Sequence, residues 1–273
     1  MSMLNRDLLR RATTGLAIAS LALGLVPPVS ASGAGTDRLM LTASGSALNS
    51  ASGGGRAAVT WLQSLNADAL LGGGGEYDTI GNAHWTLGTV TSALSGGSQA
   101  NRWTVAADGR FGAGDIGPSR FDYDVEGVGV ADTLSHVFTV RLETRQFDIY
   151  TTHGNLSKAG LSLLVASHWL LGAAYAHSTG GNLGTVLTSA RLDHFGSTVS
   201  WFVGAAKGHV APAVLNVQTG ATGPVPRYWE GYAGLLKTFR RTQWMVSADY
   251  LYLLAGTRQV TLTVTCSLLS SQS

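Results

Sequence analysis

A strict alternation of apolar and polar residues constrains this chain more than any other feature of its sequence. It is clearest in RQVTLTVTCSLL, residues 258–269, where one parity carries Val260, Leu262, Val264, Cys266 and Leu268 and the other carries Thr261, Thr263, Thr265 and Ser267. Successive side chains of a strand point to opposite faces, so this segment presents one apolar face and one hydroxyl face. A soluble β-sandwich has such strands, and so does a transmembrane β-barrel whose apolar face meets lipid and whose polar face meets a lumen.

The same alternation recurs in segments that carry charges on the polar parity. Three of them are RWTVAADGRFG at 102–112, RFDYDVEGVGV at 120–130 and HVFTVRLE at 136–143. If the polar parity faces inward, as it does in a transmembrane barrel, these segments place charges in the lumen. Our candidates for lumen or solute-binding residues are Asp108, Arg110, Asp122, Asp124, Glu126, Arg141 and Glu143. We expect Asp68 and Glu76, in the segment ADALLGGGGEYDTIG, to face inward as well.

Counted back from the carboxyl terminus, the pattern predicts about fourteen strands. The expected strands are 257–269, 243–254, 227–240, 198–208, 184–195, 170–178, 158–168, 145–152, 134–143, 119–131, 101–114, 83–94, 67–79 and 55–64. A further alternating segment, DRLMLTASGSALN at 37–49, is either an additional strand or a sign that one of these divisions is wrong. Bacterial outer-membrane barrels have even strand numbers, so we expect 12–16 strands, with fourteen preferred.

The connections and the tryptophans favour a barrel over a sandwich. In a barrel whose last strand ends in the periplasm, long extracellular loops alternate with short periplasmic turns. The strand count assigns 209–226, 151–158 and 95–101 to the extracellular side, and 240–243, 193–198, 143–146 and 80–82 to the periplasmic side. Six tryptophans lie toward one end of their segments, as interfacial girdles or ordinary cross-strand aromatic pairs would place them. They are Trp61, Trp85, Trp103, Trp201, Trp229 and Trp244.

The first 31 residues have the pattern of a secretory signal peptide. Arg6, Arg10 and Arg11 precede an apolar run at 15–26, and small residues lead to Ala31, after which we expect cleavage. An amino-terminal membrane anchor is the alternative, but the run is shorter than the roughly 20 residues that span a bilayer. The predicted organisation is a signal peptide at 1–31, a Gly/Ser-rich leader at 32–54 with room for a first strand, and a β-barrel at 55–273.

Charge is scarce in this chain. Charged residues make up 12% of it, against about 25% in soluble globular domains. A lipid-facing surface must omit charge, because Lys or Arg at mid-depth costs about 2–4 kcal/mol. The formal net charge of +2 is carried by the predicted signal peptide, and no cluster of Lys and Arg follows it. We therefore expect no nucleic-acid partner.

Together with the signal peptide, the segments NRWTVAADGRFG, SRFDYDVEGVGV, SADYLYLLAG and RQVTLTVTCSLL resemble those of Gram-negative outer-membrane β-barrel proteins. Within that class the chain is similar to barrel domains of the YaiO type, which occur with exopolysaccharide and cell-envelope systems. The resemblance implies an all-β, antiparallel transmembrane β-barrel in the bacterial outer membrane. Its implied partners are outer-membrane lipid and the barrel-insertion machinery. One departure is the ending SLLSSQS, where such barrels commonly end on an aromatic residue.

The resemblance and the inward charges imply a porin-like pore or an envelope-assembly component, with a solute or saccharide in the lumen and no cofactor. The charges themselves fit two arrangements. They line an aqueous channel and set which solutes pass, or they pair across the lumen and plug a narrow barrel. The sequence leaves both arrangements open.

Two further classes of function compete with a pore: a deacylase-like enzyme that modifies outer-membrane lipids, and a secreted all-β binding protein. The enzyme would use His177 beside Ser178, but adjacent strand residues point to opposite faces and cannot easily form a catalytic pair. The seven His residues show no metal-ligand spacing, and the single Cys266 cannot form an internal disulfide. We therefore expect no catalytic residues and no metal.

Overall fold

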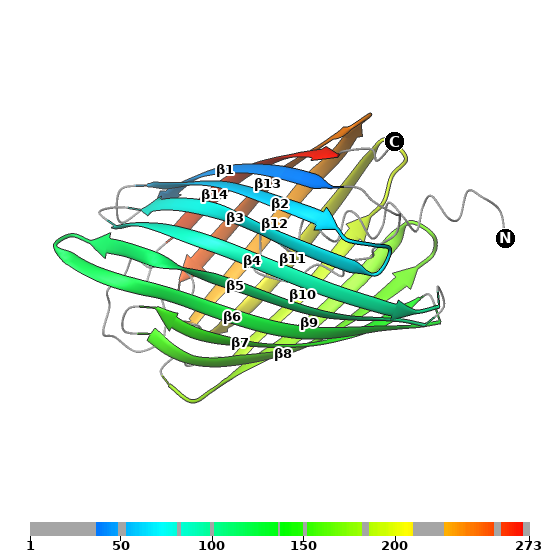
Figure 1. The fold of residues 1–273 in the computed structure, drawn as a ribbon, viewed down its shortest axis with the longest axis horizontal. Helices are drawn as coiled ribbons and strands as arrows, with labels where there is room; N and C mark the ends of the chain where they lie inside the picture. Colours follow the sequence, from blue (N-terminus) through cyan, green and yellow to red (C-terminus); the bar gives the residue numbers. More distant parts are fainter. Residues whose placement is uncertain are drawn as a thin grey trace.

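The structure, a computed structural model, describes residues 37–48, 53–80, 83–98, 101–135, 137–149, 152–181, 186–209, 227–253 and 258–269. The expected signal peptide at 1–31 and the tail after Leu269 lie outside these residues. In the described part the chain forms one antiparallel sheet that closes on itself into a barrel (Figure 1). No helix of this part is long and apolar enough to cross a membrane.

The barrel has fourteen strands, and each pairs with its neighbours in the sequence. They are β1 (Arg38–Leu48), β2 (Gly54–Ser64), β3 (Ala69–Ile80), β4 (Ala83–Gly97), β5 (Arg102–Ile116), β6 (Ser119–Leu134), β7 (Phe138–Ile149), β8 (Thr152–Val165), β9 (Trp169–Thr179), β10 (Val186–His194), β11 (Val199–His209), β12 (Arg227–Phe239), β13 (Thr242–Leu253) and β14 (Arg258–Leu269). Strands β1 and β14 close the ring, with Arg38 opposite Leu269 and Leu48 opposite Gln259. The predicted all-β antiparallel barrel of fourteen strands is thereby confirmed.

Two of the expected strand divisions are wrong, and their errors cancel in the count. The segment at 37–49 is a true strand, β1, whereas 134–143 and 145–152 are largely one strand, β7. Residues 143–146 are all polar, which suggested a turn. In the structure they continue the alternation, with Glu143 and Arg145 buried and Thr144 and Gln146 exposed.

This correction reverses the expected sides of the upstream connections. The connection between Gly97 and Arg102 lies at the same end of the barrel as the start of β1 and the end of β14, and the connection after Ile80 lies at the opposite end. The longest connection, 210–226, is at that opposite end, which we therefore take as extracellular. Residues 95–101, expected outside the cell, belong to the periplasmic side, and 80–82 to the extracellular side.

The outer wall carries an apolar band between two rows of aromatic side chains. Trp103 and Phe111 bound this band on β5, and Trp244 and Tyr252 bound it on β13. Each pair, with its two aromatics included, spans nine residues, which matches the about 9–11 residues of a transmembrane strand. The lower row, at the periplasmic side, consists of Trp61, Trp103, Trp169, Trp201 and Trp244. The upper row consists of Tyr77, Phe111, Trp229, Tyr250 and Tyr252.

Beyond the upper row the wall between β4 and β8 inverts. On β6, Val128 and Val130 are 46% and 45% exposed, whereas Phe121 and Val125, nearer the extracellular end and of the opposite parity, are 4% and 3% exposed. The buried cluster at this end consists of Ala83, Trp85, Leu87, Phe121, Val125, Phe147 and Ile149. The β5–β6 hairpin reaches farthest at the left end of the view (Figure 1). Above the membrane both sides of the wall meet water, so apolar side chains pack inside and polar ones face out.

Candidate functional site in the barrel interior

Direct opposition across the sheet identifies the inner wall. Asp108 on β5 lies opposite Gly127 on β6, and Gly127 lies opposite Arg145 on β7, so these three positions share one face. The other parity of β6 carries Val128 and Val130 of the apolar band. Asp108 and Arg145 therefore face the interior.

Arg145 binds two carboxylates on this inner wall. Its Nη1 and Nη2 donate to the two Asp108 carboxylate oxygens at 3.0 Å each, and its Nε donates to Glu143. The Arg145 side chain is 8% exposed and the Glu143 side chain 4%, so the charges are largely removed from water. A bidentate arginine contact combined with a second carboxylate is the arrangement that offsets such desolvation. We refer to Asp108, Glu143 and Arg145 as the Arg145 cluster.

Gly127, on the intervening strand β6, leaves room for Asp108 on β5 and Arg145 on β7 to meet. A Cβ atom at Gly127 would lie 3.0 Å from Asp108 Oδ1 and 3.1 Å from Arg145 Cγ. A larger residue would push the guanidinium away from Asp108. The absence of a side chain at Gly127 thus allows the Asp108 and Arg145 side chains to approach each other closely across β6.

Three further cations share the interior with this cluster. Lys158 on β8 lies opposite Glu143, and Arg141 precedes Glu143 by two residues on the same face. Arg110 follows Asp108 by two residues and interacts electrostatically with Glu76 and Asp78. Within the described residues, Arg110 and Lys158 make no hydrogen bond or salt bridge, but Arg110 interacts electrostatically with Asp108 and Lys158 with Glu143.

Three of the seven predicted lumen candidates lie on the outer wall instead. Asp122, Asp124 and Glu126 on β6 have the parity of Val128 and are exposed. Asp124 lies opposite Phe111 of the upper aromatic row. The physical reason is the inversion described above, because this end of β6 leaves the membrane and its outer face meets water. The structure thus brings together Asp108, Arg110, Arg141 and Glu143 inside and separates them from the other three.

The interior holds charged groups that the sequence candidates did not include. Arg56 on β2 donates to Glu76 on β3. Arg191 and Asp193 pair along β10 at 2.6–3.0 Å, with Arg191 stacked 4.1 Å from the Phe202 ring. Their spacing of two residues, which puts both on one face of a strand, was a usable signal in the sequence.

On the far side of the ring the interior carries two carboxyl groups. Glu230 on β12 and Asp249 on β13 lie within hydrogen-bonding reach of each other. Neither forms a salt bridge with a basic residue of the described part of the chain. Glu230 escaped detection because the segment around it, YWEGYAG, has no polar alternation that would mark a lumen face.

Four of the inner charges stand at one level of the barrel. Glu76, Arg110, Glu230 and Asp249 each neighbour, in sequence, an aromatic of the upper row: Tyr77, Phe111, Trp229 and Tyr250 respectively. Because neighbouring strand residues point to opposite faces, these four charges lie just behind the upper aromatic row. We call these four charges the charged belt.

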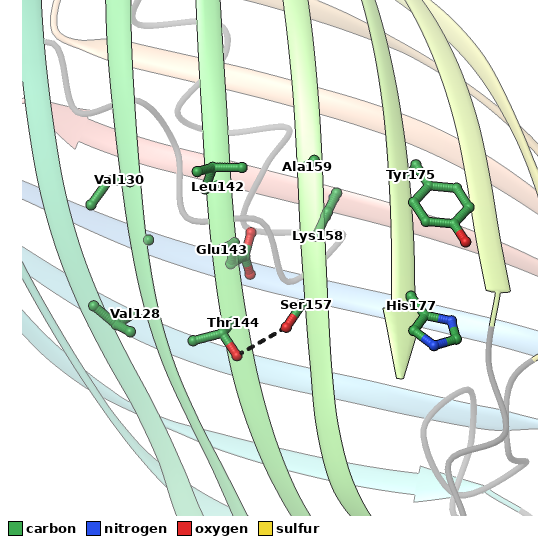
Figure 2. A pocket seen from close by; sticks show the side chains of 11 residues that line it. Val128, Val130, Leu142, Glu143, Thr144, Ser157, Lys158, Ala159, Tyr175 and His177 are labelled. Carbon is green, nitrogen blue, oxygen red and sulfur yellow. Dashed lines mark hydrogen bonds between the residues drawn. The ribbon is translucent and has the colours of Figure 1, made fainter. Parts of the chain in front are cut away.

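The outer wall has a shallow depression between β6 and β9. Figure 2 shows Thr144, Ser157, Tyr175 and His177 on its rim, with a hydrogen bond of 3.5 Å between the Thr144 and Ser157 hydroxyls. His177 is exposed on this outer face, and Ser178 has the opposite parity. The two residues of the deacylase hypothesis therefore lie on opposite sides of the wall. No group of three or more His, Cys, Asp or Glu residues in the described ranges is arranged to hold a metal ion.

Comparisons with known proteins identify the fold. No protein-family description matches the chain, and no curated protein is similar to it in sequence. Among solved structures it is similar to the CymD monoaromatic hydrocarbon channel, with a TM-score of 0.59 and 10% identity over 90% of this chain and 91% of that one. It is also similar to the Acinetobacter baumannii outer membrane protein Omp33, with a TM-score of 0.53 and 13% identity over 84% of this chain and 97% of that one. The fold is that of bacterial outer-membrane β-barrels, as the sequence predicts.

Proposed function

We propose that this barrel is a passive channel for small hydrophilic solutes across the outer membrane. The observation that carries the proposal is the direction of the inner ion pairs. Arg145 pairs within β7 and with β5, Arg56 pairs with the neighbouring β3, and Arg191 pairs within β10. These pairs run along the wall and do not bridge opposite sides of the ring, which favours a lined lumen over a plugged one.

The inner face of the seam between β14 and β1 favours an uncharged polar solute as a second class of cargo, in addition to ions. Its inner face carries the hydroxyls of Thr42, Ser44 and Ser46 on β1 and of Thr261, Thr263 and Thr265 on β14, with Thr42 and Thr265 hydrogen-bonded at 3.1 Å. Rows of hydroxyls suit the hydroxyl groups of saccharides, so a saccharide is the neutral cargo that we propose. The resemblance to YaiO-type barrels, the link to exopolysaccharide and a role in envelope assembly stay predictions.

Planar lipid bilayers test the channel. We expect the detergent-purified barrel to insert and produce stepwise increases in current in symmetric salt, because water and ions fill a polar lumen. A sample of the same preparation that has been heated and unfolded serves as the control. A folded barrel that inserts into vesicles yet produces no current steps and admits no sugar would show that the lumen is closed.

A further inference from the structure

Four side chains form a row across the outer wall at the extracellular interface. Lys207 on β11 lies directly opposite Trp229 on β12, and Trp229 lies opposite Tyr252 on β13. Tyr252 lies in turn opposite Arg258 on β14. Lys207, Trp229 and Arg258 are exposed, and all four positions have the parity of the apolar band. This outer row, at the level of the upper aromatic row, thus has a cation at each end of an aromatic surface.

The contacts within the outer row join its members. The Trp229 and Tyr252 ring centroids are 6.0 Å apart, and the Arg258 guanidinium lies 5.8 Å from the centre of the Tyr252 ring. Three strand intervals of about 4.7–4.9 Å separate β11 from β14, so the Lys207 and Arg258 backbones are roughly 14 Å apart. This separation is of the order of the length of a hexose disaccharide.

The protein supplies no outward carboxylate on these strands. The carboxyl groups of β11–β14 belong to Glu230 and Asp249, and both have the inner parity. Within the described residues, Lys207 and the exposed Arg227, two residues beyond Trp229, form no salt bridge. The sequences that adjoin the outer row, 210–226 and 254–257, contain no charged residue. The outer row is therefore an anion-attracting surface.

The opposite part of the outer wall has the opposite sign. At the same end of the barrel, β6 and β7 carry four exposed, outward carboxylates: Asp122, Asp124, Glu126 and Asp148. In the ring, β6 lies seven strands from β13 in either direction. An anionic headgroup of the surrounding lipid is thus attracted to β11–β14 and repelled from β6 and β7.

The wall beneath the outer row has space for acyl chains. Ala205 and Gly231 are two residues nearer the middle of the membrane than Lys207 and Trp229, and they lie opposite each other. A Cβ atom at Gly231 would have no atom within 4 Å. A lipid whose headgroup covers the outer row can therefore lay its hydrocarbon against this part of the apolar band.

We propose that the outer row binds the headgroup of lipid A, the phosphorylated glycolipid of the outer leaflet. That headgroup is a hexosamine disaccharide with a phosphate at each end. One phosphate binds Lys207 and the other binds Arg258 through charge-assisted hydrogen bonds, while the sugar rings lie over Trp229 and Tyr252. The inference goes beyond the proposed channel, because it concerns the outer wall and holds whether or not the lumen conducts.

Native mass spectrometry of the full chain, purified in detergent and mixed with purified lipids, tests the inference. Bis-phosphorylated lipid A is the probe, and monophosphoryl lipid A, which lacks one of the two phosphates, is the matched probe. We expect the bis-phosphorylated form to bind about fivefold more tightly, the preference that one more contact between a cation and an anionic headgroup supplies. Lys207→Gln with Arg258→Gln should bring this ratio close to one. Lys207→Arg with Arg258→Lys keeps both charges and should retain it.

Two cations at the periplasmic end of the same sheet provide the control. Lys237 on β12 and Arg240 in the turn after it are exposed. Lys237→Gln with Arg240→Gln makes the same change of charge at the other interface, so we expect it to keep the wild-type ratio. Equal binding of the two lipids to the wild-type chain, or an equal loss of the ratio in the periplasmic variant, would overturn the role of the outer row. Phosphatidylglycerol bound as tightly as bis-phosphorylated lipid A would overturn the assignment to lipid A.

Discussion

Replacing Arg145 with Ala should lower the free energy of unfolding by about 3–5 kcal/mol, because it leaves Asp108 and Glu143 without their shared cation in a largely desolvated site. The guanidinium donates to both carboxylates and is only 8% exposed. Unfolding by urea in lipid vesicles, followed by tryptophan fluorescence, measures the change. The triple variant Asp108→Asn, Glu143→Gln and Arg145→Met removes all three charges together and should recover most of the loss.

A surface lysine supplies the control for this measurement. Lys207 on β11 is exposed, and Lys207→Ala removes one charge without opening a buried cluster. Its effect should stay within about 0.5 kcal/mol of zero. Equal losses for Arg145→Ala and Lys207→Ala would mean that the Arg145 cluster does not contribute to stability.

Arginine at neighbouring positions of β14 should have very different effects. Val264 is 40% exposed on the apolar band, so Val264→Arg should cost about 2–4 kcal/mol by placing a charge in lipid. Thr263 faces the hydroxyl-lined interior, where water can solvate an added guanidinium, so Thr263→Arg should cost much less. The same unfolding assay in vesicles compares the two variants.

The comparison of these two variants depends only on which face of β14 meets lipid. The substitutions add the same side chain at adjacent residues of one strand, so differences in strand propensity largely cancel. A larger loss for Thr263→Arg than for Val264→Arg would show that the assigned faces are reversed.

Local alternation made most of the fold predictable. The rule that successive strand residues point to opposite faces correctly grouped the apolar parity of β14 and of the membrane part of β5, including Trp103 and Phe111. The same rule failed at 143–146, where four polar residues suggested a turn. Alternation without a change of parity was the better guide at that point, because Glu143 and Arg145 keep the parity of Arg141.

Parity alone could not tell inside from outside along a strand that leaves the membrane. On β6 the apolar residues change parity between Val125 and Val128, and on β7 they change between Leu142 and Phe147. These shifts mark the level at which water replaces lipid outside the wall. Read as a boundary, the shift on β6 predicts that Asp122, Asp124 and Glu126 face out.

The pairing within the interior was beyond the reach of the sequence. Asp108 and Arg145 are 37 residues apart, and their contact depends on the register of β5, β6 and β7 and on Gly127 between them. The charged belt likewise joins β3 and β5 to β12 and β13 only through closure of the ring. Closure brings together residues that no local pattern relates.

Chemical modification of single channels tests the central claim, a water-filled lumen lined by the polar parity, most directly. Cys266→Ser removes the only cysteine of the chain, and Thr263→Cys or Leu262→Cys then adds one thiol to either face of β14. A charged, water-soluble thiol reagent reacts with thiolates in water and not with thiols in lipid. We predict a stepwise fall of single-channel current for Thr263→Cys and no change for Leu262→Cys. A fall for Leu262→Cys alone, or no current in either variant before modification, would contradict the account.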